Sequence, residues 1–221
     1  MLLTRHYTAQ AGPLNEHATS YLKTISDVTA ALTVTGGQFT QYESGAVYSR
    51  NGSYSPAPVS AKNSQGLVEY AGSYIGFSKV NGSTTDITPV VGTPSPGLVT
   101  SQASQVSGDL FIVVDFSNST LRGVVENRVL TAINNTTGAT VVESVPNLVL
   151  KKTDVTVDGT FTGDVQILGN TDVGTFAGIL GGPESEAIAG GLYVDNHFED
   201  QLDGEEEFGI FFRTMWYVFH Q

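Results

Sequence analysis

The sequence contains no cysteine. Disulfides, thiolate nucleophiles and cysteine-ligated metals are therefore excluded together. Any metal site would have to use histidine and carboxylate side chains, and the histidines are His6, His17, His197 and His220. They do not stand at the spacing of a metal-binding motif, so we predict no metal site and no cofactor.

Basic residues are also scarce, because 10 lysines and arginines stand against 22 acidic residues and give a net charge of −12. The excess lies entirely in the second part of the chain: residues 101–221 hold 17 acids and 5 bases, whereas residues 1–100 hold 5 of each. Phosphate binding needs clustered basic residues, which this sequence does not have. We therefore expect no nucleic-acid partner.

Long apolar runs are missing as well, since none approaches the ~20 residues of a membrane helix. We expect no membrane insertion. The opening residues, MLLTRHY, show no basic segment before a long apolar core and no cleavage site, so no signal peptide is visible in this numbering. A virion, or an extracellular or cell-surface location after removal of a signal, both stay open.

One segment near the N-terminus has helical spacing. After the Gly12–Pro13 break, apolar residues recur at three- and four-residue intervals: Leu14, Ala18, Tyr21, Leu22, Ile25 and Val28. This pattern predicts an amphipathic helix. Together with short strand-like runs it forms an expected N-terminal helix and β-hairpin attachment region over residues 1–63.

From Leu67 onward, short strand-like runs alternate with turn residues. The candidate strands are 67–77, 106–116, 119–127, 154–168, 173–181, 189–194 and 208–214. The connections are short, as at residues 115–120, which favours antiparallel neighbours. We predict a mainly β protein whose residues 64–214 form an antiparallel barrel of about eight strands.

Glycines alternate with large side chains on one face of these predicted strands. Successive residues of a strand point to opposite faces, so Gly174, Phe176 and Gly178 share a face, and Gly72, Tyr74 and Gly76 do the same. In a small barrel, each missing side chain leaves room for an aromatic ring from a neighbouring strand. The pattern therefore predicts a packed interior, which argues against a lipocalin-like carrier of small molecules.

The same residues carry a resemblance to the transferrin-binding-protein-like β-barrel family. The stretch GTF at Gly174–Phe176, followed by GPESEAIAGGLY at Gly182–Tyr193, resembles its signature of Gly-x-Phe, a Gly-Pro turn with a glutamate, and an aromatic strand. YAGSYIG at residues 70–76 resembles its opening strand, residues 113–125 a hairpin, and FGIF at residues 208–211 its closing strand. The matching positions that we single out are Gly72, Tyr74, Gly76, Gly174, Phe176, Gly182, Pro183, Glu186, Gly190 and Gly191.

This resemblance covers residues 67–214 and implies a non-enzymatic surface module that binds a host protein such as transferrin, a haem protein or a complement factor. Ser185 and Ala187 replace the usual alanine and glutamate of the turn, and the lipidation cysteine of the family is absent.

No catalytic motif is present: the sequence has no Gly-x-Ser-x-Gly elbow, phosphate-binding glycine loop or His-Glu-x-x-His. We therefore predict that the protein is not an enzyme. Residues 195–207 contain seven acids and no base, but the sixth position counted from Asp195 is Asp200, where a calcium-binding EF-hand loop requires glycine. A solvated acidic loop is the favoured interpretation, and cation binding stays open.

Two functions are consistent with these features. The first is a structural or decorating protein of a virion or surface array, in which the barrel is displayed and protein contacts hold it to other subunits. The second is an exported barrel that captures a host or haem-related protein.

For the first function, the C-terminal tail at residues 215–221 and the predicted N-terminal helix are the expected contacts with a partner subunit. Aromatic and apolar anchors commonly dominate such contacts. The residues concerned are Met215, Trp216, Tyr217, Phe219, Leu14, Tyr21 and Ile25.

Overall fold

The structure is a computed structural model, and it describes residues 2–11, 14–36, 44–58, 66–79, 104–133, 139–167, 171–195 and 206–214. These residues form two antiparallel sheets. The strands of the first sheet are β1 (Leu2–Ala11), β2 (Leu14–Ile25), β3 (Val28–Gly36) and β4 (Ser44–Arg50). The second sheet contains β5 (Leu67–Lys79), β6 (Ser104–Asp115), β7 (Thr120–Ile133), β8 (Thr140–Ser144), β9 (Leu148–Asp154), β10 (Thr160–Ile167), β11 (Thr171–Gly181), β12 (Ala187–Asp195) and β13 (Glu206–Thr214).

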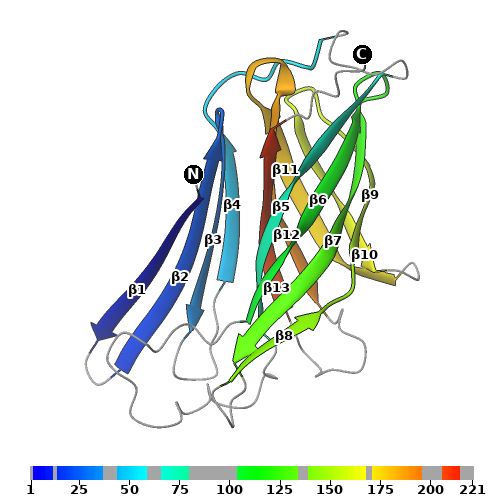
Figure 1. Ribbon diagram of the computed structural model, residues 1–221. Coiled ribbons are helices and arrows are strands. Elements are labelled where there is room, and N and C mark those ends of the chain that lie inside the picture. Colours follow the sequence, from blue (N-terminus) through cyan, green and yellow to red (C-terminus); the bar gives the residue numbers. More distant parts are fainter. Residues whose placement is uncertain are drawn as a thin grey trace, which may run out of the picture.

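The second sheet closes into an eight-stranded antiparallel barrel (Figure 1). Its order is β6–β5–β13–β12–β11–β10–β9–β7, and β7 pairs again with β6. The ninth strand, β8, pairs with residues 129–133 of β7, beyond the part of β7 that pairs with β9. The predicted mainly β fold and its antiparallel barrel are confirmed.

Alternation of side chains along each strand creates the barrel interior. In β6, Leu110, Ile112 and Val114 are at most 1% exposed and point inward, whereas Phe111 between them is 45% exposed on the outside. The inward residues of all eight strands form one continuous apolar core.

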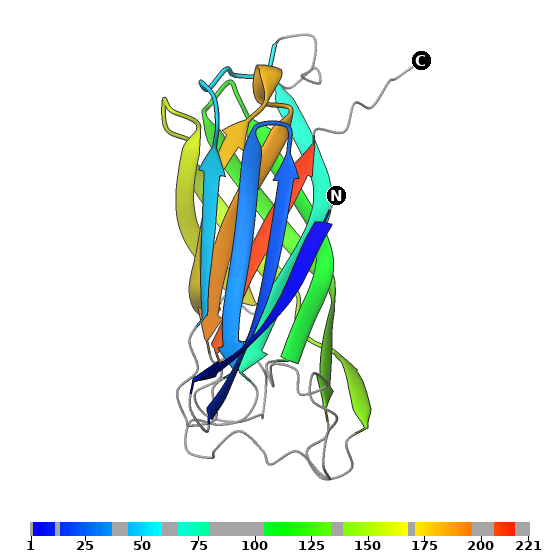
Figure 2. The same cartoon turned by 90° about the vertical axis from the view of Figure 1, so that its left-hand side faces the viewer.

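The first sheet packs face-on against the outer wall of the barrel, over β11, β12 and β13 (Figures 1 and 2). Its inward residues, among them Val28, Leu32 and Val34, are fully buried in a second apolar core. The barrel contributes outward residues such as Phe77 and Ile210 to this core. The molecule therefore has one core inside the barrel and another between the barrel and the four-stranded sheet.

The helix predicted from Leu14 to Val28 is wrong. Residues 14–25 form β2 and Val28 begins β3, with a tight turn at Ser26–Asp27 in which Ser26 has φ of 53°. The helical spacing was partly coincidental, because Tyr21 and Ile25 also satisfy the two-residue period of a strand that packs one face on the barrel. In place of a helix and hairpin region, residues 2–11, 14–25, 28–36 and 44–50 form the four strands of one sheet.

The seven strands expected after Leu67 are all present as β5, β6, β7, β10, β11, β12 and β13. The eighth strand of the barrel, β9, was not predicted. Its neighbour β10 begins at Thr160, because residues 156–159 form a turn in which Gly159 has φ of +74°. The single run expected over residues 154–168 is therefore the end of β9, this turn and β10.

Candidate functional site

The barrel interior holds aromatic rings where a ligand cavity would otherwise be. Phe161 lies between Phe176 and Phe211, with ring centroids 6.1 and 6.4 Å apart. A Cβ atom added to Gly163 would lie 2.7 Å from Cε1 of Phe176, and one added to Gly178 would lie 2.7 Å from Cε2 of Phe161. Each glycine thus makes room for a ring from the adjacent strand, as the alternating pattern predicted. This packing leaves the inside of the barrel to its own side chains.

A fully buried ionic cluster lies at one end of this interior. The Arg128 guanidinium on β7 donates from Nη2 to both carboxylate oxygens of Glu207 on β13, at 2.7 and 2.6 Å, and also donates to the Pro146 carbonyl. The Tyr74 hydroxyl donates to the same carboxylate. Burial raises the pKa of Tyr74 well above its usual value. Both charged side chains are 0% exposed, so the cluster links β5, β7 and β13 inside the barrel and offers no open site.

Glu207 corrects part of the sequence interpretation. It belongs to the acidic segment 195–207, which was expected to be a solvated loop, yet Glu206 and Glu207 begin β13 and Glu207 is buried. A carboxylate can be buried here because Arg128, a residue far away in sequence, neutralises it. Residues 196–205 lie outside the described part of the chain.

The Gly-Pro turn of the family signature joins the barrel to the four-stranded sheet. Gly182 donates its N–H to the Asp27 carboxylate in the β2–β3 turn, and Ser26 Oγ lies 2.9 Å from Oε1 of Glu186. Pro183 opens a single 3-10 turn, η2 (Pro183–Ser185). The turn is therefore built into the contact between the two sheets.

The buried side of the same turn is fixed to the barrel. The Tyr70 hydroxyl donates to the carbonyl of Ser185 at 2.6 Å, and the Ser185 hydroxyl donates to the carbonyl of Ser55 at 2.5 Å. Glu184 and Ser185 adopt φ of 59° and 57°. Left-handed backbone at two consecutive residues other than glycine costs free energy that the surrounding contacts must offset. These hydrogen bonds give the signature turn a structural role.

The other signature glycines pack closely against main chain or rings. A Cβ atom added at Gly72 would lie 2.8 Å from Cβ of Arg213. A Cβ atom added at Gly174 would lie 2.7 Å from Cα of Val194, and a Cβ atom added at Gly190 would lie 2.7 Å from Cε2 of Phe211. Gly76 borders the hydroxyl of Tyr74, and Gly191 lies 3.0 Å from Cβ of Ala46 on β4 by the same measure.

Of the residues expected to contact a partner subunit, Tyr21 and Ile25 have described side chains. Tyr21 is 7% exposed, stacks on Phe77 with ring centroids 5.3 Å apart, and donates its hydroxyl to Oε1 of Gln105 at 3.1 Å. Ile25 packs in the second core. Both side chains therefore contact the barrel of their own chain.

The backbone of Leu14 pairs with Ala11 at the start of β2. The tail residues Met215, Trp216, Tyr217 and Phe219 lie outside the described residues, so the expected role of the tail stays a prediction.

The outer wall of the barrel, on β5, β6, β7 and β9, carries an apolar row. The strand registers place Ala71, Phe111, Val124 and Val149 side by side across these strands. Phe111 is 45% exposed, and the other three side chains are partly exposed. An aromatic ring open to solvent beside further apolar side chains is typical of a protein-binding surface.

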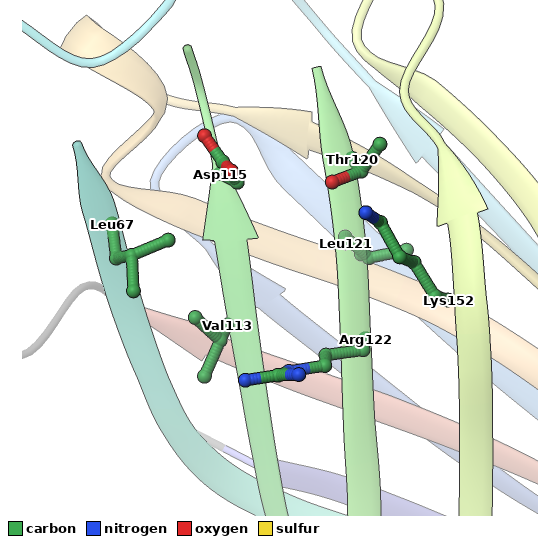
Figure 3. A pocket seen from close by; sticks show the side chains of 7 residues that line it. All are labelled: Leu67, Val113, Asp115, Thr120, Leu121, Arg122 and Lys152. Carbon is green, nitrogen blue, oxygen red and sulfur yellow. The ribbon is translucent and has the colours of Figure 1, made fainter. Parts of the chain in front are cut away.

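A hollow of about 150 Å³ lies next to this row, because Val113, which lines it, is two residues from Phe111 on the same face of β6. Figure 3 shows the side chains that line the hollow. Leu67, Val113 and Leu121 form its apolar walls, and Asp115, Thr120, Arg122 and Lys152 supply polar groups. Arg122 extends from β7 toward β6, and Lys152 extends from β9 toward Thr120 (Figure 3).

A β-bulge concentrates positive charge beside the hollow. Leu121 pairs with Thr153 and Gly123 pairs with Leu150, so Lys151 and Lys152 both lie opposite Arg122. Bulges of this kind redirect side chains at a strand pair. Lys151 turns to the carboxylates of Asp164 and Asp172, at 3.4 and 3.3 Å, whereas Lys152 lines the hollow.

The carboxylate of the hollow already has partners. Asp115 accepts hydrogen bonds from the N–H groups of Ser117 and Asn118 and from Nδ2 of Asn118, and the Asn118 side chain is the largest cause of its lowered pKa. Arg122 and Lys152 make no hydrogen bond or ion pair with any residue that the structure describes. The hollow therefore presents two cations on apolar walls in a protein of net charge −12.

The sequence interpretation did not identify this site. Its residues come from β5, β6, β7 and β9, and β9 was not predicted. The available signal was the Lys151–Lys152 pair in an acidic half of the chain.

Nowhere among the described residues do three histidine or carboxylate side chains converge in a way that could hold a metal ion. The same residues also contain no helix of the length and apolar character needed to cross a membrane.

Comparison with known proteins gives matches among solved structures. No family model and no curated protein matches the chain. The intact protein Ap-TbpB, with its N and C lobes, aligns at 12% identity and a TM-score of 0.49, covering 96% of this chain and 38% of that one. A double mutant of transferrin-binding protein B from Haemophilus parasuis Hp5 aligns at 12% identity and a TM-score of 0.49, and the alignment covers 96% of this chain and 37% of that one.

The isotype 1 transferrin-binding protein B from serogroup B Neisseria meningitidis aligns at 14% identity and a TM-score of 0.42. The alignment covers 96% of this chain and 36% of that one. The chain thus spans 36 to 38% of the length of these structures. They carry the name of the family that the sequence resembles.

Proposed function

We propose that this chain is a non-enzymatic β-barrel module that binds another protein through the outer wall of β5, β6, β7 and β9. The observation that carries the proposal is Phe111, an aromatic ring 45% exposed in the centre of a row of apolar side chains and next to a charged hollow. Soluble proteins rarely leave such a combination open unless it is used for binding.

The closed barrel supports this role in two ways. Its interior is filled by side chains, which leaves the outer surface as the place for recognition. Its continuous ladder of hydrogen-bonded strands holds the surface residues in fixed positions, which lowers the entropic cost of binding.

The resemblance of the sequence supplies the class of partner to test. A host protein captured at a cell surface, such as transferrin, a haem protein or a complement factor, is the first candidate. Phe111 carries the proposal, so substitution of this aromatic side chain is the decisive test.

The experiment measures binding of the immobilised chain to transferrin, a haem protein and a complement factor by surface plasmon resonance. We expect one of them to bind the wild type and Phe111→Ser to weaken that binding at least ~10-fold, since hot-spot aromatics commonly contribute about 2 kcal/mol or more. Val157→Ser is the matched control, because Val157 is 92% exposed in the β9–β10 turn, away from the row. Equal binding by the wild type and Phe111→Ser would contradict the proposal.

A second candidate is a subunit displayed on a virion or surface array. The observation in its favour is the outward face of the four-stranded sheet, where Leu22, Ala31 and Val47 form an uncharged row across β2, β3 and β4. Leu22 and Val47 are 42% and 67% exposed. This function predicts that the full chain self-associates in analytical ultracentrifugation and that Val47→Glu makes it monomeric. A monomeric wild type would count against it.

A further inference from the structure

We propose that the hollow beside Phe111 receives a carboxylate carried on an apolar stem, supplied by the bound protein as its C-terminal residue or as an acidic side chain next to an apolar one. This inference deepens the proposed protein-binding function and rests on it. It names the chemistry that the partner must present.

Two cationic side chains line the hollow. Arg122 and Lys152 both line it, and neither makes an ion pair or hydrogen bond with another described residue. The bulge places Lys152 opposite Arg122 in the strand register, and the Arg122 side chain borders the hollow on the side of β6 while Lys152 borders it beside Thr120 (Figure 3). An anion that enters the hollow lies between these two donors, where charge-assisted hydrogen bonds are available to it.

The hollow already contains one carboxylate, that of Asp115. Asp115 offsets one of the two cations through its charge, but three donors of its own turn hold its oxygens: two backbone N–H groups and Nδ2 of Asn118. Its distance from Lys152 and Arg122 exceeds that of an ion pair. Since two cations and one carboxylate line the hollow, one positive charge is in excess there.

The walls of the hollow between the charged groups are apolar. Leu67 and Val113 are partly buried and Leu121 is 1% exposed, so the surface between the cations is apolar. An inorganic anion would bury no apolar area there. An apolar stem would cover these walls and gain about 25 cal/mol for each Å² removed from water.

The hollow is continuous with the apolar row. Val113, which forms one wall, lies two residues from Phe111 on the same outward face of β6. A partner chain that rests on Phe111 can therefore place one residue in the hollow without leaving the surface.

The test uses the full chain and small probes of known chemistry, followed by ¹⁵N–¹H correlation spectra. N-acetyl-leucine presents a C-terminal carboxylate on an apolar stem, and N-acetyl-leucinamide is identical except that the charge is absent. The capped dipeptide N-acetyl-glutamyl-leucinamide presents an acidic side chain instead. Inorganic phosphate presents an anion without a stem.

We expect N-acetyl-leucine or the glutamyl dipeptide to shift the amide signals of Val113, Thr120 and Arg122, with a Kd on the order of 1–10 mM for a ligand of this size. Which of the two binds more tightly identifies the source of the carboxylate. N-acetyl-leucinamide and phosphate are expected to bind at least fivefold more weakly.

Three variants localise the effect. Arg122→Gln and Lys152→Gln each remove one cation of the hollow and are expected to weaken binding at least fivefold. Lys151→Gln removes the neighbouring charge that already pairs with Asp164 and Asp172, and it should leave the affinity within twofold of the wild type. The correlation spectra also show that each variant is folded.

Equal binding of the acid and the amide, equal effects of Lys151→Gln and Lys152→Gln, or shifts that map away from the hollow would overturn the inference. So would the absence of any shift at 50 mM of either carboxylate probe. Such a result leaves the proposed function standing if Phe111→Ser still abolishes binding of a protein partner. Loss of the Phe111 effect is the separate result that removes the proposed function.

Discussion

At the scale of single residues, the buried Arg128–Glu207 pair is where the barrel depends most on one interaction. Both side chains are fully buried, and the Tyr74 hydroxyl also donates to the carboxylate. Taking both charges out of water is costly, and the pair offsets this cost only while it is complete. The complete pair therefore adds little net stability, whereas the loss of one partner is costly.

Arg128→Met leaves the Glu207 carboxylate buried without its counter-charge, so we expect a loss of about 3–5 kcal/mol in the free energy of unfolding. The double variant Arg128→Met/Glu207→Gln removes both charges and keeps an acceptor for Tyr74. It should therefore be more stable than Arg128→Met alone. Urea unfolding of the wild type, both single variants and the double variant measures this coupling, and a double variant less stable than Arg128→Met would contradict it.

The turn after β6 gives a prediction on pH. The Asn118 side chain, two backbone N–H groups and the charge of Lys152 favour the ionised form of Asp115 and lower its pKa. Because the folded-state pKa lies below the unfolded-state pKa of about 3.9, the stabilising contribution is present above that pH and is lost as the pH falls through the folded-state pKa.

Asn118→Ala removes the largest cause of the shift, so the pKa of Asp115 should rise toward its ordinary value. A pH titration of the Asp115 carboxyl carbon by NMR measures this directly. The difference in stability between the wild type and the variant should be largest near neutral pH and should shrink below about pH 4. An unchanged pKa in Asn118→Ala would show that the backbone donors alone determine it.

At the scale of strands, glycines of the barrel and of the outer sheet meet different surroundings. Gly178 gives space to the Phe161 ring on the neighbouring strand, whereas an added Cβ at Gly45, in β4 on the outer sheet, meets nothing within 4 Å. Gly178→Ala forces Phe161 out of its position and should cost about 1–3 kcal/mol.

Gly45→Ala is the matched control. It should leave the stability unchanged or raise it by up to about 1 kcal/mol, because alanine loses less backbone entropy on folding. Thermal unfolding of both variants compares them, and a similar loss in each would show that strand entropy, and not ring packing, is the reason for the cost.

The strands also show how far the sequence alone predicts this protein. The Gly-x-aromatic alternation was sufficient to predict a packed barrel, since both its period and its packing are local properties of the strands. β2 was mistaken for a helix because Leu14, Ala18 and Tyr21 fit a helical period, and only its contact with the barrel makes the strand the better solution. The hollow could not be predicted, because it depends on the unpredicted β9 and on a bulge that brings Lys152 next to Arg122.

At the scale of the whole molecule, the outer sheet and the barrel are held together by their shared core and by the turn at Gly182–Glu186. Arg50 at the end of β4 adds to this junction, because its Nη1 donates to the carbonyls of Leu180 at 2.6 Å and Asp158 at 3.0 Å. The two surfaces proposed for binding, the wall around Phe111 and the outward face of the sheet, are therefore parts of one connected body. A partner that binds either surface therefore contacts residues that the rest of the molecule holds in place.

The last prediction separates the stability of the barrel from that of this junction. A chain that lacks residues 1–63 keeps the closed ladder of strands and most of the inner core, so we expect it to fold and to melt cooperatively. It also exposes the outward apolar side chains that the sheet covers, among them Phe77, Ile210 and Phe212. We therefore expect a lower Tm and self-association in analytical ultracentrifugation, because an open apolar wall of this kind associates in water.

Adding Phe77→Ser and Phe212→Ser to the deleted chain should restore the monomer while keeping the cooperative melt, since both side chains point away from the inner core. The matched control adds Phe111→Ser, which alters the opposite, already exposed wall and should leave the self-association unchanged. If the deleted chain does not melt cooperatively, then the four-stranded sheet is part of what folds the barrel. In that case the two cores must form together, and residues 1–63 are not a separable attachment region.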